Sequence, residues 1–250
     1  MSTWILLRGL TREARHWGDF PQQLSQVLED SKVIALDLPG NGEFNAKRSP
    51  MSIGGMTEHC RAELMRRGLT PPYRLLAISM GGMVAVDWAA RYDREIELAV
   101  LINTSMRPFS PFHHRLQAST WLRMLRLFLP ASPGARESAI FALTSNLPEA
   151  PHRLIEQWIE IRQSRPVSAS NALRQLLAAA RFRAPVAAPS AKLQIVGSAN
   201  DRLVDVSCSM ALAQAWNGEA ILHPVAGHDL PLDDPNWLAD QVQNLHKALP

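Results

Sequence analysis

The stretch RLLAISMGGMVAVDWAA, residues 74–90, joins an apolar run of strand length to a helical pattern. A single serine, Ser79, lies at the junction, with Ala77 two residues before it and Gly81 two residues after it. A serine on a tight strand-to-helix turn is held in a strained backbone conformation, and neighbouring chain passes so close that the flanking residues must be small. The stretch therefore predicts an exposed nucleophilic serine. An ordinary helix cap after a buried strand is the alternative that these residues alone leave open.

Apolar runs of similar length recur on both sides of this stretch. Most are nearly continuous rather than alternating, which is typical of strands that are buried on both faces of a parallel sheet. We expect strands at residues 4–7, 32–38, 74–79, 97–103, 192–198 and 220–225. Helical patterns fill the intervals at residues 19–29, 53–68, 81–92, 207–216 and 235–248. This alternation predicts an α/β fold with a mostly parallel, doubly wound sheet.

Residues 105–185 interrupt the alternation, because they contain helical patterns and prolines but no convincing strand. We expect helices within residues 121–129, 137–143, 152–163 and 170–182. We interpret this segment as a helical cap over one end of a core formed by residues 1–104 and 186–250. Between residues 106 and 183 there are eleven arginines, no lysine, four glutamates and no aspartate. Such a basic cap could attract an anionic substrate or an acidic acyl carrier protein, or its arginines could simply solvate amphipathic helices.

A nucleophilic serine needs a base and an acid that orients the base, and the chain offers both after later strands. Asp201 follows the apolar run 192–198, and His228 follows the last one. The carboxyl ends of parallel strands share one edge of the sheet, where sites form in open α/β folds. Asp205 is the nearest rival acid, and we place Asp201 first because the turn after Gly197 presents it first.

Five segments together resemble the α/β-hydrolase superfamily of serine esterases, lipases and C–C hydrolases, over residues 1–104 and 186–250. The resemblance implies that Ser79 is the nucleophile, Asp201 the acid and His228 the base. It also implies an oxyanion hole formed by the backbone N–H groups of Leu10 and Met80. The Met80 group is independently expected there, because the helix that begins after Ser79 directs free N–H groups at the site. The segments are LLRGLTREARHW, VIALDLPGNGEF, LLAISMGGMVA, VGSANDRLVD and VAGHDLPLDDP.

Three positions depart from the pattern of that superfamily. Arg8 stands where a histidine usually precedes the glycine of the first loop, and Ala77 replaces the first glycine of the serine turn. Asn41 stands where members often carry histidine. These departures leave all three triad residues in place and affect the assignment of the substrate.

The resemblance implies a serine hydrolase that cleaves a carboxylic ester or thioester of a small molecule without a cofactor. Serine at the nucleophile position argues against the dehalogenases and epoxide hydrolases, which use aspartate. Three alternatives are a C–C bond hydrolase or menaquinone-pathway-like lyase, an esterase for substrates linked to acyl carrier protein, and a non-catalytic binding module. The last would require the loss of a triad residue. Four aromatic residues of the cap are candidates for lining the substrate pocket, although such residues more often serve in packing: Trp121, Phe128, Phe141 and Trp158.

Composition and motifs exclude several other classes. A net charge of +3 over 250 residues is not a balance typical of nucleic-acid binding. The chain has no phosphate-binding loop, Rossmann glycine pattern or HExxH motif, so we expect no nucleotide cofactor and no metal. No apolar run approaches the roughly 20 residues that span a membrane. The two cysteines have no metal-ligand spacing, and we expect free thiols in a reducing compartment, which favours the cytoplasm.

Overall fold

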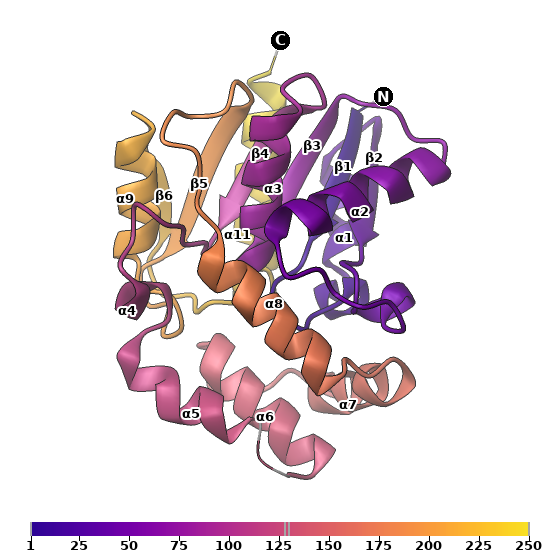
Figure 1. The fold of residues 1–250 in the computed structure, drawn as a ribbon, viewed down its shortest axis with the longest axis vertical. Helices are drawn as coiled ribbons and strands as arrows, with labels where there is room; N and C mark the ends of the chain where they lie inside the picture. Colours follow the sequence, from indigo (N-terminus) through magenta and orange to yellow (C-terminus); the bar gives the residue numbers. More distant parts are fainter. Residues whose placement is uncertain (1, 128, 130, 250) are drawn as a thin grey trace.

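One parallel sheet organises the molecule. The computed structural model describes residues 2–127, 129 and 131–249. All strand pairs are parallel, in the order β2-β1-β3-β4-β5-β6. This arrangement confirms the predicted fold class, and each expected strand overlaps an observed one (Figure 1). The strands are β1 (Ser2–Leu7), β2 (Ser31–Leu36), β3 (Tyr73–Ile78), β4 (Ile96–Ile102), β5 (Lys192–Ser198) and β6 (Ala220–His223).

Helices cover both faces of the sheet, and each face has its own apolar core. On one face α2, α3 and α9 pack on the sheet, and on the other face α1 and α11 do so. Every residue of β3 is buried, which explains why its sequence lacks the alternation of a strand with one wet face. These helices are α1 (Phe20–Val27), α2 (Ile53–Arg66), α3 (Met80–Arg91), α9 (Ser207–Ala215), α10 (Leu230–Asp233) and α11 (Pro235–Lys247).

The chain reverses its direction across the sheet at β1. The chain moves from β1 outward to β2 and then returns to β3 on the other side of β1. Leu7 at the end of β1 is in register with Ala77 near the end of β3. The loop that begins at Arg8 therefore lies beside Ser79, at the kind of crevice where open α/β sheets bind ligands.

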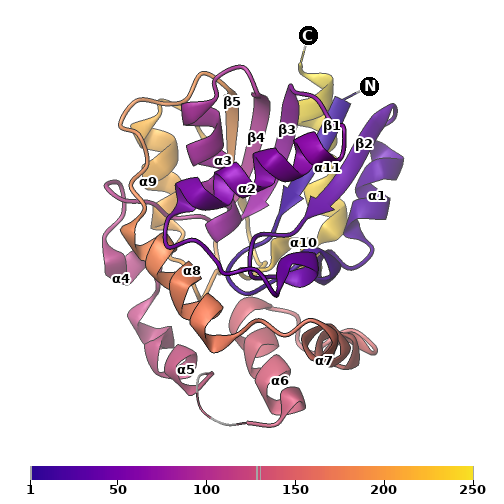
Figure 2. The same ribbon diagram turned by 45° about the vertical axis from the view of Figure 1, so that its right-hand side comes forward.

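The segment between β4 and β5 is helical in its regular parts. Its helices α5, α6 and α7 lie beyond the carboxyl ends of the strands, and α8 runs back toward β5 (Figure 2). Each predicted helical pattern in this segment overlaps one of α5 to α8, although α5 ends at Arg126, and Phe128 lies outside the described residues. We call this segment the insertion; its helices are α4 (Phe112–Arg115), α5 (Trp121–Arg126), α6 (Pro133–Thr144), α7 (Leu154–Ser164) and α8 (Ala169–Arg181).

The helices show no membrane-spanning segment. None in the described ranges combines the length and the apolar character needed to cross a bilayer.

Candidate active site

The backbone at Ser79 adopts a conformation that L-residues rarely take. Its φ is 56° and its ψ is −121°, between the end of β3 and the first residue of α3. A Cβ built on Gly81 would lie 2.5 Å from the carbonyl oxygen of Leu7, which explains the small residue two positions after the serine. A Cβ on Gly9 would approach the Ser79 Cβ to 3.0 Å. The turn thus depends on close contact between the backbones at the ends of β1 and β3, as the sequence pattern predicts.

His228 and Asp201 form a hydrogen-bonded pair at the same edge of the sheet. The Nδ1 atom of His228 lies 2.7 Å from Oδ2 of Asp201, and both residues are buried. The other oxygen of Asp201 accepts the backbone N–H groups of Leu203 at 2.7 Å and Val204 at 3.0 Å. A carboxylate held in this way fixes the orientation and the tautomer of the imidazole.

Asp205, the rival acid, does not bind the imidazole but accepts a hydrogen bond from the start of α9. Its Oδ1 accepts the backbone N–H of Ser207 at the start of α9, at 2.9 Å. A hydrogen bond from the Ser207 side chain holds the pKa of Asp205 below its ordinary value. Asp205 therefore shapes the entry to α9, whereas Asp201 contacts the imidazole.

Asn103, directly after β4, ties the loops of this edge together. Its Nδ2 donates to the backbone carbonyl of His228 at 2.9 Å and to Oγ of Ser198 at 3.0 Å. Its Oδ1 accepts the backbone N–H of Ser198 at 2.8 Å. Asn103 has a φ of 45° and is buried, so this one side chain connects the end of β5 to the loop that carries His228.

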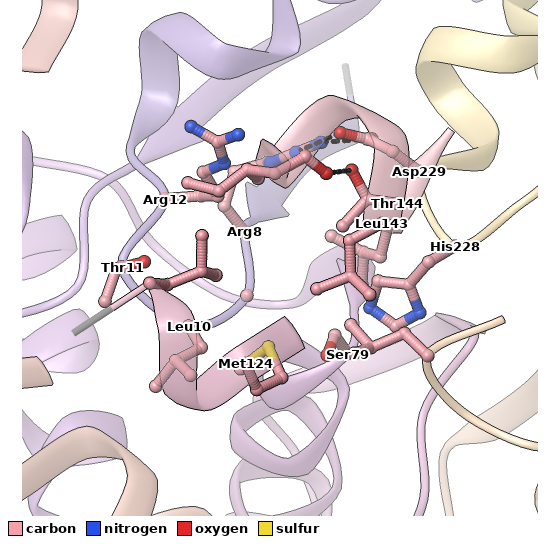
Figure 3. Close-up of a pocket in the computed structure, with 15 residues that line it drawn as sticks. Arg8, Leu10, Thr11, Arg12, Ser79, Met124, Leu143, Thr144, His228 and Asp229 are labelled. Carbon is pink, nitrogen blue, oxygen red and sulfur yellow. Dashed lines mark hydrogen bonds and ion pairs between the residues drawn. The ribbon is translucent and has the colours of Figure 1, made fainter. Parts of the chain in front are cut away.

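Ser79 and His228 line the same cavity, of about 100 Å³, between the sheet edge and the insertion (Figure 3). Its other walls combine the loop after β1 with side chains from the insertion, all but one of them apolar. Those insertion residues are Met124, Leu127, Ile140, Leu143 and Thr144. The arrangement brings a serine and a histidine to one partly open, mostly apolar cavity.

The loop after β1 lines this cavity, and its backbone is hydrogen-bonded to a side chain of the insertion. Within the described ranges, the backbone N–H groups of Leu10 and Met80 have no hydrogen-bond acceptor. The next backbone N–H, of Thr11, donates to Oε1 of Gln175 on α8 at 2.9 Å. Gln175 is fully buried and also donates to Oδ1 of Asn41 at 2.7 Å. Sequence analysis missed Gln175, because its partners lie more than a hundred residues away in the chain.

Arg8 replaces the usual histidine with a buried ion pair. Its two terminal nitrogens donate to the two carboxylate oxygens of Asp229 at 2.8 and 2.7 Å. Burial alone would raise the pKa of Asp229, but the charge and hydrogen bonds of Arg8 hold it below its ordinary value. The guanidinium also lies over the ring of Trp17, 4.9 Å from its centroid. Since Asp229 follows His228 directly, this pair connects the loop after β1 to the loop after β6.

Arg12 makes a second connection, between the core and the insertion. Its Nη1 donates to Glu137 on α6 at 2.9 Å, and its guanidinium lies 4.1 Å from the ring centroid of Trp158 on α7. Glu137 is fully buried and also binds Arg162. Burial lowers the pKa of Arg12, while the charge of Glu137 opposes that change. Arg12 and Glu137 are 125 residues apart, so no local sequence signal predicts the contact.

The three described aromatic candidates of the insertion are not among the residues that line the cavity with Ser79, and their role in binding a substrate stays a prediction. Phe141 and Trp158 are buried with Ile161 in a small core of the insertion itself. Trp121 is partly exposed, stacks on Phe112 and donates its indole N–H to the carbonyl of Leu116. Phe128 lies outside the described residues. Helical periodicity identifies a buried face, but the same face can meet another helix or a substrate.

Metal-ligating and thiol chemistry find no support in the described part of the chain. No group of three or more His, Cys, Asp or Glu side chains there could hold a metal ion. Cys60 and Cys208 are free and buried, and burial raises the pKa of Cys60 to about 12 and that of Cys208 to about 11. Neither thiol forms a reactive thiolate near neutral pH.

The sheet order, the strained serine turn and the acid–imidazole pair define a class, the α/β-hydrolase fold. The chain belongs to the alpha/beta hydrolase family, whose family model matches residues 4–241. This membership agrees with the resemblance drawn from the sequence motifs.

Individual relatives are distant. The chain is 25% identical to "Putative carbamate hydrolase RutD" of Cronobacter turicensis, over 84% of this chain and 78% of that protein. Another curated match is 28% identical over 82 residues and spans only 25% of that protein's length. Among solved structures, an esterase from Thermogutta terrifontis superposes with a TM-score of 0.74 at 20% identity, covering 99% of this chain and 90% of that one. The 2-hydroxy-6-oxo-6-phenylhexa-2,4-dienoate hydrolase from Rhodococcus sp. strain RHA1 superposes with a TM-score of 0.77 at 17% identity. The match covers 99% of this chain and 91% of that one.

Proposed function

We propose that the protein is a serine hydrolase that cleaves a carboxylic ester or thioester through an acyl-enzyme on Ser79. The observation that carries the proposal is a serine on a strained turn that shares a cavity with an imidazole bound to a buried carboxylate. We assign Ser79 as nucleophile, His228 as general base and Asp201 as the orienting acid. We also propose that the insertion acts as a cap on a core of residues 1–104 and 186–250.

The reaction follows from these positions. The Ser79 oxygen bonds to the acyl carbon as His228 Nε2 accepts the hydroxyl proton, and Asp201 stabilises the imidazolium through Nδ1–H. The negative oxygen of the tetrahedral intermediate accepts the N–H groups of Leu10 and Met80, and one such donor typically contributes about 3–4 kcal/mol. His228 then donates the proton to the leaving alcohol or thiol. Water, deprotonated by His228, attacks the acyl carbon, and the acid product leaves as Ser79 regains its proton.

Hydrolysis of a p-nitrophenyl ester series from acetate to decanoate tests the proposal. We expect turnover by the wild type and its loss in Ser79→Ala, whereas Ser138→Ala, at an exposed serine of α6, should retain it. Because apolar side chains wall a small cavity, we expect kcat/KM to be highest for short acyl chains. Equal activity in wild type and Ser79→Ala would refute the assignment.

A carbamate is a second candidate substrate, favoured by the similarity to the carbamate hydrolase of Cronobacter turicensis, which extends over 84% of this chain. The same nucleophile and oxyanion donors would act on its carbonyl: the alcohol leaves with the proton from His228, and water then releases the carbamoyl group from Ser79 as a carbamic acid. Comparing kcat/KM for a carbamate and an ester of the same alcohol decides between them. The C–C hydrolase, lyase and carrier-linked alternatives stay predictions. The carrier-linked alternative requires a steep fall of activity with salt.

A further inference from the structure

A second cavity, of about 300 Å³, adjoins the one that contains Ser79. The two cavities share one wall, made by the loop after β1 and by side chains of α5 and α6. Leu10, Thr11 and Arg12 from the loop line both. A substrate whose carbonyl lies at Ser79 could therefore extend one end past this loop into the second cavity.

The second cavity has an excess of positive charge. Four arginines and two glutamates are among its lining residues. Both glutamates already have arginine partners: Glu137 binds Arg12 and Arg162, and Glu13 binds Arg15, which lies outside the lining. Glu137 offers no free oxygen, because each of its two carboxylate oxygens accepts one of these arginines. Both acidic groups of the wall are thus paired with arginines, one of them outside the wall, and the wall keeps an excess of positive charge.

Guanidinium N–H groups at this cavity lack partners. Nη2 of Arg12 is buried and, within residues 2–127, 129 and 131–249, has no hydrogen-bond acceptor. Arg136 donates through Nη2 to the carbonyl of Leu129, but its Nε is likewise buried without a described partner. A buried charged donor without an acceptor is destabilising, and an anion that these guanidinium groups reach by a side-chain rotation would supply the missing acceptor. His16, which also lines the cavity, has a pKa held well below its ordinary value by burial and is neutral.

We propose that this cavity binds an oxyanion group, a carboxylate or a phosphate, at the end of the substrate remote from the bond that is cleaved. The inference deepens the proposed function, on which the position of the scissile bond depends. Arg12 and Arg136 donate to the oxyanion, and the planar guanidinium group suits such a ligand better than a lysine ammonium does. The protein would then prefer half-esters of dicarboxylic acids, or phosphate-bearing esters, to neutral esters of equal length.

Equilibrium binding tests the anion site without any catalytic turnover. In the Ser79→Ala background, calorimetry compares adipic acid monoamide, 5-phosphonopentanamide and neutral hexanamide. We expect an anionic amide to bind about ten- to a hundredfold more tightly than hexanamide, since hydrogen bonds to charged groups contribute about 1.5–3 kcal/mol. The tighter of the two anions identifies the group. Equal affinity for all three amides would overturn the inference.

Matched arginine variants test whether the preference for anionic ligands depends on the arginines of this cavity. Arg12→Gln leaves Arg162 on Glu137, and Arg136→Gln removes no described ion pair, so the second variant keeps the test available if the first fails to fold. The control is Arg181→Gln, which removes the same charge from an exposed position of the insertion. The anion preference should fall about tenfold or more in Arg12→Gln and Arg136→Gln and persist in Arg181→Gln. An equal fall in all three variants, or none in any, would show that the cavity is not the anion site.

Turnover separates this inference from the proposed function. We expect the kcat/KM ratio of mono-p-nitrophenyl adipate to p-nitrophenyl hexanoate to exceed one and to fall in Arg136→Gln but not in Arg181→Gln. Loss of both activities in Ser79→Ala with an unchanged ratio in Arg136→Gln would refute the anion site alone. Full activity in Ser79→Ala would refute the proposed function, while the calorimetric comparison would still decide the anion site.

Discussion

At the scale of single residues, Asp201 and Asp205 show what the local sequence can predict about the partner of His228. Both are carboxylates in one loop after β5, and the sequence favours Asp201 because it is the first that the turn presents. In the structure Asp201 contacts His228, and Asp205 instead accepts the N–H of Ser207. The contact agrees with the preference for Asp201, whose role as the acid stays a prediction.

The same pair gives a matched test of the proposed acid. Asp201→Asn removes the charge that stabilises the imidazolium and favours the wrong tautomer of His228, so we expect kcat to fall by about 10⁴-fold. Asp205→Asn should leave kcat near the wild-type value, since its side chain contacts the start of α9. Steady-state kinetics on a p-nitrophenyl ester measures both. A larger loss of kcat in Asp205→Asn than in Asp201→Asn would show that Asp205, and not Asp201, is the acid.

Contacts that join distant parts of the chain could not be predicted from the residues. Gln175 holds the backbone of Thr11, and Glu137 pairs with Arg12, across 164 and 125 residues respectively. A glutamine or a glutamate on a helix shows no local sign of such a partner. These contacts become visible only when the insertion is placed against the loop after β1.

At the scale of elements, apolar periodicity and the positions of prolines predict whether a segment is a helix or a strand. They predict less well what that segment packs against. The strand positions and the helical character of α5 to α8 follow from apolar spacing and from prolines. The same spacing leaves open whether Phe141 and Trp158 face a substrate or another helix, and in the structure they pack within the insertion. The sequence of an apolar helix face does not indicate what covers that face. Burial against another helix and burial against a ligand both remove the same apolar surface from water.

Two glycines test the close contact at the serine turn. In Gly81→Ala the new Cβ would meet the backbone oxygen of Leu7 at 2.5 Å, and backbone at a strand end cannot move away easily. We expect a loss of about 1–3 kcal/mol in the free energy of unfolding and, because Ser79 is displaced, a fall in kcat of about 100-fold. Urea unfolding and ester kinetics measure the two effects.

Gly134→Ala on α6 is the matched control. Its nearest neighbour to a new Cβ is Cδ1 of Ile159 at 3.6 Å, an ordinary contact. The free energy of unfolding should stay equal or rise by up to about 1 kcal/mol. If Gly81→Ala behaved like Gly134→Ala, the turn would not depend on the close approach of the strand ends.

At the scale of the whole molecule, charge is distributed unevenly, and the structure gives this a location. The sequence shows that the insertion is rich in arginine but cannot say which arginines face the core. The structure places Arg136, Arg162 and Arg165 on the cavity beside the loop after β1. Arg162 is paired with Glu137. The excess positive charge of the insertion is therefore carried at this cavity by only a few arginines.

Global stability should depend on pH through His16. Burial, together with the nearby charges of Arg12 and Arg8, holds the pKa of His16 well below 6.5, so the folded protein keeps this imidazole neutral. The unfolded chain binds the proton more readily below pH 6.5, and stability that is present above that pH is lost as the pH falls. We expect His16 to contribute a loss of about 1 kcal/mol per pH unit below 6.5.

Urea unfolding at pH 7.5 and 5.5 measures this dependence. His16→Gln should reduce the difference between the two pH values, whereas His113→Gln, at an exposed histidine, should leave it unchanged. An identical pH dependence in wild type and His16→Gln would show that another group controls acid stability.

The most direct test of the central claim is the mass of the protein after reaction with a fluorophosphonate, followed by peptide mapping. An activated nucleophile at Ser79 predicts a single covalent adduct on the peptide that contains Ser79, with loss of ester hydrolysis in proportion to labelling. Labelling should become far slower in His228→Ala, because the base that activates the hydroxyl is gone. Complete loss of hydrolysis with the adduct on a different serine, or rapid hydrolysis with no adduct, would contradict the assignment of Ser79 as the nucleophile.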